Sequence, residues 1–164
     1  MLTVISRNKR MKAVFISFIL AALLISACDL LNSPKDLDSE KRVVSNQVEF
    51  ILEVPENNFF LKDSLRFSFI VKNRSSQKKD FSFANIQQIG FNLSQGERVA
   101  LFYPWAVAPA LSYFSLEPGE EKKFNVSKNF KDHTGKYIKR GSYKLKAYLL
   151  DKNSPILEVP ISVF

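Results

Sequence analysis

The chain has 164 residues, with 24 Lys and Arg against 16 Asp and Glu, and only one His, one Cys and one Trp. This length supports one substantial core, and 46% apolar with 24% charged residues is ordinary for a globular protein. A single Cys excludes an internal disulfide, and one Cys with one His excludes a zinc site made of Cys and His alone. Catalysis through histidine would have to use His133.

Residues 1–27 have the pattern of a secretion signal. Four basic residues precede an apolar run at 13–27, and no acidic residue occurs before Asp29. The run is shorter than the roughly 20 residues of a stable membrane span. Without residues 1–27 the net charge falls from +8 to +4. This mild excess, with no basic helix or stripe, predicts no nucleic-acid partner.

The apolar run ends in Leu24-Ile25-Ser26-Ala27-Cys28. This segment resembles the bacterial lipoprotein signal, which has an aliphatic residue three before the cysteine and small residues next. The resemblance implies cleavage after Ala27, a lipid on the sulfur of Cys28, and a bilayer of the cell envelope as the first partner. The alternative is an uncleaved signal anchor with an incidental free Cys.

Two points about this signal stay open at the sequence level. Asp29 resembles an inner-membrane retention signal of enteric bacteria, but that rule does not hold in all phyla, so the inner or outer membrane is undecided. The true start is Met1 or Met11. Residues 28–45 are polar, carry mixed charges and show no sustained period, which predicts a lipidated flexible tether.

From residue 46 to 164, short apolar runs alternate with polar residues at a period of two. Turn residues separate the runs about every ten positions, for example Pro118-Gly119 and Thr134-Gly135. The pattern predicts an all-β fold, an immunoglobulin-like antiparallel β-sandwich of about 7–8 strands. The predicted strands lie near 48–54, 65–71, 89–93, 99–103, 124–126, 143–149 and 156–164.

Two further patterns bear on the packing of this domain. Ile-Leu-Glu-Val-Pro occurs at 51–55 and at 156–160, and its proline predicts that the first and last strands are both edges, unless the match is chance. Thirteen of the 15 Phe follow residue 45 and are predicted to form the core. Phe59 and Phe60, in a predicted loop, are the expected exceptions.

Three segments occur in a recognisable order: a strand closed by Asn-Arg-Ser at 63–75, a Leu-Glu-Pro-Gly-Glu turn into a strand at 116–124, and a Gly-Ser-Tyr strand start at 141–149. In that order and at those distances they resemble the BsuPI-type domain of an intracellular proteinase inhibitor. The resemblance covers about 59–150 and implies an immunoglobulin-like sandwich that binds a proteinase. Gly90 stands where the family has Asp, and Leu101-Phe102-Tyr103 stands where a Trp is expected. The fold therefore carries over more strongly than the inhibitory activity.

One histidine and one group of glutamates have side chains suited to catalysis or metal binding. His133 lies in a turn without a positioned nucleophile, which predicts a solvated side chain. Glu117, Glu120 and Glu121 adjoin two lysines, which predicts a charge-balanced turn rather than a calcium site. We therefore expect no catalytic residue, no metal and no cofactor.

The candidate partner-binding loop contains Phe102, Tyr103, Pro104 and Trp105. No charged residue occurs between Arg98 and Glu117, and prolines flank the only Trp. A stiff, uncharged, aromatic loop is a good protein-binding anchor, and the alternative is that Trp105 plugs the core.

We expect a non-enzymatic, protein-binding lipoprotein, with a proteinase as the specific partner. The alternative is a structural or assembly lipoprotein without inhibitory activity, and the sequence leaves the oligomeric state open.

Overall fold

The computed structural model describes residues 39–164. The predicted signal, Cys28 and most of the predicted tether lie outside the described residues. Within residues 39–164, no helix is long and apolar enough to cross a membrane.

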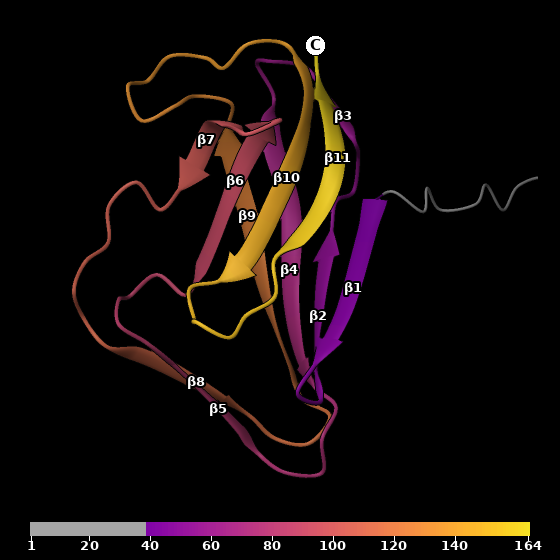
Figure 1. Cartoon of the computed structure of the whole chain (residues 1–164), viewed down its shortest axis with the longest axis vertical. Helices are drawn as coiled ribbons and strands as arrows, with labels where there is room; N and C mark the ends of the chain where they lie inside the picture. The colour runs from indigo at the N-terminus through magenta and orange to yellow at the C-terminus, as the bar shows by residue number, and fades with distance from the viewer. Residues whose placement is uncertain (1–38) are drawn as a thin grey trace, which may run out of the picture. The chain divides into compact units, whose positions relative to one another are not determined.

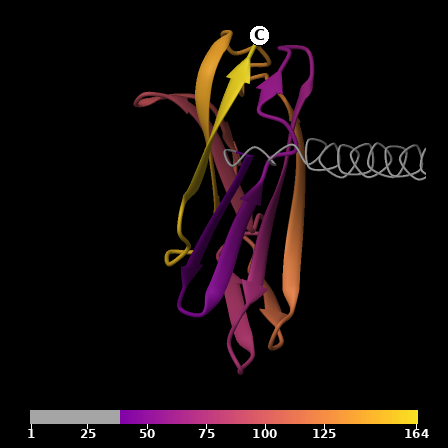
Figure 2. The same cartoon turned by 90° about the vertical axis from the view of Figure 1, so that its right-hand side faces the viewer.

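The described chain folds into two facing sheets and a separate two-stranded ribbon (Figures 1 and 2). The first sheet has the order β1 (Glu40–Ser45), β2 (Val48–Glu53), β4 (Ser64–Asn73) and β9 (Glu121–Asn129). The second has the order β3 (Asn58–Phe59), β11 (Leu157–Val163), β10 (Gly141–Leu149), β6 (Ile89–Gln95) and β7 (Arg98–Tyr103). The ribbon pairs β5 (Lys79–Phe83) with β8 (Ser112–Leu116). The predicted all-β sandwich is confirmed, with 11 strands instead of 7–8.

Phenylalanine rings join the two sheets, as the composition predicted. Phe67 of β4 meets Phe91 of β6 edge to face, with 5.1 Å between ring centroids. Phe59 packs in the same way on Phe130, at 5.5 Å, and both are buried. Phe59 was expected as an exception and is in the core, whereas Phe60 is 71% exposed. Such rings each bury about 150–250 Å², which lets a domain without disulfides hold together.

The predicted tether boundary is wrong, because β1 begins at Glu40 and pairs antiparallel with β2. Asn46 and Gln47, both at positive φ (51° and 62°), form the two-residue turn between these strands. Positive φ at both central residues is the geometry of a tight hairpin turn, and Asn is among the residues that tolerate it. The turn lacks the glycine that usually marks such hairpins. Only Val43 of β1 packs on the core, so the strand shows little hydrophobic period.

The prediction that both Ile-Leu-Glu-Val-Pro strands are edges is wrong for the first copy. β2 lies between β1 and β4. In the second copy, β3 pairs with β11 only at Ser162 and Val163. Pro160 lies outside that short pairing, so the missing N–H of the proline costs no bond to β3.

The buried side chain of Asn73 ties together three segments at the end of β4. Its Nδ2 donates to the carbonyl oxygens of Gln77 (2.7 Å) and Leu116 (3.0 Å). Its Oδ1 accepts from the backbone N–H (2.9 Å) and the hydroxyl (2.7 Å) of Ser75. These hydrogen bonds explain the Asn-Arg-Ser turn seen in the sequence. They fix the start of the β5–β8 ribbon on the sandwich.

Candidate functional site

The four residues of the predicted loop differ in their exposure to solvent. Phe102 and Trp105 face solvent, at 41% and 42% exposed. Tyr103 is half-buried and stacks on Phe91 of the core, with 5.6 Å between the ring centroids, and Pro104 follows through a cis peptide bond. Trp105 is therefore not a core plug. Tyr103 fixes the base of the loop, and Phe102 and Trp105 are its accessible rings.

Trp105 lies against the outermost strand of the first sheet. The ammonium of Lys128, on β9, sits 4.1 Å from the centroid of the indole ring. A cation over an indole face holds the ring in place at about 0.5–1 kcal/mol when exposed. The loop therefore leaves β7 of one sheet and its Trp reaches β9 of the other.

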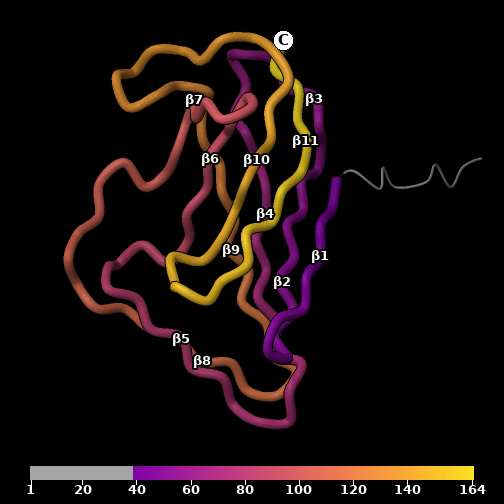
Figure 3. The backbone as a smooth tube through the Cα atoms, in the orientation of Figure 1, coloured from indigo at the N-terminus to yellow at the C-terminus, as the bar shows by residue number. Residues whose placement is uncertain are grey.

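Further exposed apolar side chains follow the four predicted residues in the chain and lie on a neighbouring connection. Figure 3 shows the long connection from β7 to β8 running along the outside of the domain, beside the connection from β5 to β6. Hydrogen bonds join the two connections, from Ala108 N to Gln87 Oε1 (3.4 Å) and from Ser112 Oγ to Asn85 O (2.7 Å). We call the exposed apolar side chains of these neighbouring segments the apolar loop surface: Ile86, Trp105, Val107, Leu111 and Tyr113.

The far end of this surface rests on a stack of aromatic rings. Phe114 of β8 stacks on Phe81 (4.6 Å between centroids) and on Phe83 (5.7 Å) of β5. The ammonium of Lys122, on β9, lies 4.3 Å from the centroid of the Phe114 ring. The ribbon therefore carries Leu111 and Tyr113 on a packed support, although each is more than 80% exposed. Sequence reasoning missed both residues. The uncharged run from 99 to 116 was the signal that could have found them.

The other predicted clusters lie in turns. His133 is exposed, and the carboxylate of Asp132 beside it accepts from Thr134 Oγ1 (2.7 Å), Thr134 N (2.8 Å) and Lys136 N (3.0 Å). These bonds, that from the Thr134 side chain foremost, lower the pKa of Asp132. Glu120 Oε2 accepts from Glu117 N at 2.8 Å and so closes its turn. Among residues 39–164, no group of three or more His, Cys, Asp or Glu is placed to hold a metal ion.

Comparison with known families bears on this arrangement. The family model described as "BsuPI: Intracellular proteinase inhibitor" matches residues 52–154, more than half of the chain. The chain belongs to the BsuPI family. The match covers most of the sandwich, the ribbon and the apolar loop surface. No curated protein sequence is similar to this chain.

Several solved structures are similar to this BsuPI domain at low sequence identity. A β-glucosidase, EmGH1 from Erythrobacter marinus, is 17% identical with a TM-score of 0.45, over 77% of this chain and 15% of that one. The alkylpurine DNA glycosylase AlkC of Pseudomonas fluorescens is 11% identical with a TM-score of 0.45, over 74% and 31%. The CARDB domain of PF1109 from Pyrococcus furiosus is 16% identical with a TM-score of 0.38, over 68% and 89%. This chain thus spans about a sixth of the β-glucosidase.

Gly90, which departs from the BsuPI pattern, has a packing role here. Gly90 of β6 pairs with Tyr148 of β10. A Cβ on Gly90 would lie 2.7 Å from Tyr148 Cε2 and 3.0 Å from Leu150 Cδ2. The tyrosine ring therefore occupies the space that any side chain at position 90 would need, so this departure belongs to the sheet rather than to the exposed surface.

Proposed function

We propose that this protein is a membrane-anchored bacterial lipoprotein whose BsuPI domain binds and inhibits a proteinase of the cell envelope. The observation that carries the proposal is the apolar loop surface, an uncharged, accessible and well-supported set of side chains in a domain of an inhibitor family. The role is non-enzymatic: binding, without bond breaking, is what these residues supply.

The apolar loop surface has the composition of a binding anchor. Trp and Tyr dominate the energetics of many protein interfaces, because each buries a large area and loses few rotamers. Pro104 and Pro109 restrict the backbone between β7 and β8, which lowers the entropy lost on binding. An extended, uncharged segment of this kind fits the substrate cleft of a proteinase or the edge of its sheet.

The lipid anchor is supported by the signal pattern that ends at Cys28. β1 begins at Glu40, twelve positions after Cys28. Twelve residues span at most about 43 Å in any conformation. The BsuPI domain would then stay close to the membrane surface, where it meets envelope proteinases rather than cytoplasmic ones.

Site-specific crosslinking in the native cells tests this proposal. A photo-crosslinking amino acid in place of Val107 should capture a proteinase, and the same group in place of Phe60 should not, because Phe60 is equally accessible but lies outside the apolar loop surface. Identical captured proteins from both positions would contradict the proposal. A specific capture at Val107 of a protein with no proteolytic activity would favour the assembly role instead.

A further inference from the structure

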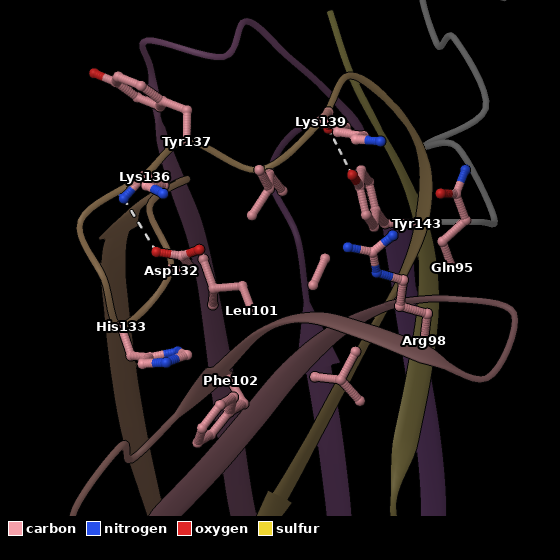
Figure 4. Close-up of a pocket in the computed structure, with 13 residues that line it drawn as sticks. Gln95, Arg98, Leu101, Phe102, Asp132, His133, Lys136, Tyr137, Lys139 and Tyr143 are labelled. Carbon is pink, nitrogen blue, oxygen red and sulfur yellow. Dashed lines mark hydrogen bonds between the residues drawn. The ribbon is translucent and has the colours of Figure 1, made fainter.

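A pocket lies along β7, and none of the residues of the apolar loop surface lines it. Figure 4 shows that side chains from the β6–β7 hairpin, the 131–140 segment and the start of β10 converge on it. Its volume is about 320 Å³. That is enough for one amino-acid residue or a small ligand, at the lower end of the range for ligand sites.

The charged side chains of this pocket are mostly cationic. Arg98, Lys136 and Lys139 line it, against one carboxylate, that of Asp132. Asp132 already accepts three hydrogen bonds within its own turn. In the described part of the chain, none of the three cations forms an ion pair with a carboxylate. The pocket therefore offers uncompensated positive charge to a ligand.

Apolar side chains also line the pocket. Leu101 and Ile138 are buried and Phe102 is 41% exposed, whereas the Tyr137 ring points away from the pocket (Figure 4). Ile138 N donates to Phe130 O (2.9 Å), which ties the 131–140 segment to the core. The pocket therefore exists before any ligand arrives, which lowers the entropy cost of binding.

Two polar groups of the pocket lie near each other, the guanidinium of the exposed Arg98 and the hydroxyl of the buried Tyr143. Figure 4 shows Arg98 directed toward Tyr143, whose hydroxyl donates to Lys139 O at 2.5 Å. Burial raises the pKa of Tyr143, and the nearby Arg98 charge opposes this shift. The Tyr143 hydroxyl therefore keeps its proton and donates it to Lys139 O, and the side-chain donors left for a ligand are those of Arg98 and the lysines.

We propose that this pocket binds a carboxylate carried on an apolar body, as at the C-terminal residue of a peptide. A guanidinium fork recognises a carboxylate with two parallel hydrogen bonds, and the lysines add charge at the mouth. The apolar lining would take the apolar side chain next to that carboxylate. Phosphate would satisfy the cations but leave the apolar lining without a partner, so we favour the carboxylate.

His133 provides a direct assay, because it is the only histidine in the chain and lines the pocket. The full chain, in non-ionic detergent and labelled with ¹³C-histidine, is titrated at constant ionic strength with acetyl-Ala-Ala-Phe. The expected result is a saturable shift of the single imidazole signal. The C-terminal amide of the same peptide should bind about tenfold more weakly or worse, because it lacks the charge that Arg98 recognises.

Two variants locate the interaction. Arg98→Gln should weaken binding of the free acid about tenfold, whereas Lys152→Gln, which removes one exposed cation elsewhere, should leave it unchanged. Trp105→Ser should also leave it unchanged, so failure here is separate from failure of the proteinase proposal. Acetyl-Ala-Glu-Ala-amide distinguishes the source of the carboxylate: tighter binding of this peptide would assign the pocket to an acidic side chain.

Three results would overturn the carboxylate proposal. One is equal affinity for the free acid and the amide. Another is inorganic phosphate binding as tightly as the peptide acid. The third is no saturable change of the His133 signal at millimolar peptide.

Discussion

Replacing Asn73 by Ala should be among the most destabilising single changes at any polar position of the domain. The side chain is fully buried and makes four hydrogen bonds. Truncation leaves the N–H of Ser75 and the carbonyl of Leu116 without this partner, and both residues are buried. A stranded buried group costs about 1–3 kcal/mol. The carbonyl of Gln77, an exposed residue, can turn to water, so its loss is smaller.

The expected loss for Asn73→Ala is therefore about 3 kcal/mol, a large part of the roughly 5–15 kcal/mol of a typical domain. Urea denaturation of the full chain, followed by far-ultraviolet circular dichroism, measures it. Asn125→Ala is the matched control, because Asn125 is exposed and its side-chain oxygen accepts one bond, from Ser68 Oγ at 2.9 Å. It should cost less than about 1 kcal/mol. Equal losses for the two variants would refute the role assigned to Asn73.

Three further outcomes are expected, two from the structure and one from the signal sequence. Gly90→Ala should cost about 1–3 kcal/mol by overpacking against Tyr148, and a double-mutant cycle with Tyr148→Ala should recover much of it; additive losses would contradict the contact. The hydrogen bond from Lys146 lowers the pKa of Glu158. The ionised carboxylate therefore adds to the free energy of unfolding above the ordinary pKa of 4.5, and this stabilisation is lost as pH falls through the lowered pKa. Glu158→Gln should therefore flatten the acid limb of the stability profile, and an unchanged limb would argue against this pair. Metabolic labelling with a fatty acid should disappear in Cys28→Ser, and persistent labelling would defeat the lipid anchor.

The strands that the sequence predicted are those with one face on the common core. Each of them contributes side chains at alternate positions to the Phe-rich interior; they are β2, β4, β6, β7, β9, β10 and β11. Period two is visible in a sequence because burial on one face imposes it. For the same reason, the fold class could be predicted before any coordinates.

The missed strands depend on partners that local pattern does not reveal. β3 has two residues, and its pairing with β11 joins segments about a hundred positions apart. β5 and β8 pair with each other outside the two sheets. β1 is mostly polar, and the Asn46-Gln47 turn lacks the usual glycine signal. In each case the segment is a strand because it pairs with another segment, and its own sequence does not show this.

The candidate sites also combine features that are visible in the local sequence with features that only the packing reveals. The uncharged run around Trp105 is a local property and was found, but the contact of Trp105 with Lys128 joins it to a strand of the other sheet, which local sequence does not reveal. The cationic pocket brings Arg98 together with Lys136 and Lys139, about forty positions away. Neither group alone is unusual in sequence, so only the packing of the 131–140 segment beside β7 reveals the site.

Titration of the captured proteinase with the purified full chain tests the central claim most directly. The account predicts that peptidase activity falls saturably with added chain, and that the pair Trp105→Ser with Val107→Ser weakens inhibition about tenfold or more, as expected for loss of an aromatic anchor. The control Phe60→Ser should inhibit like the parent chain. Full proteolytic activity at a saturating excess of the parent chain, or equal inhibition by all three proteins, would contradict the account.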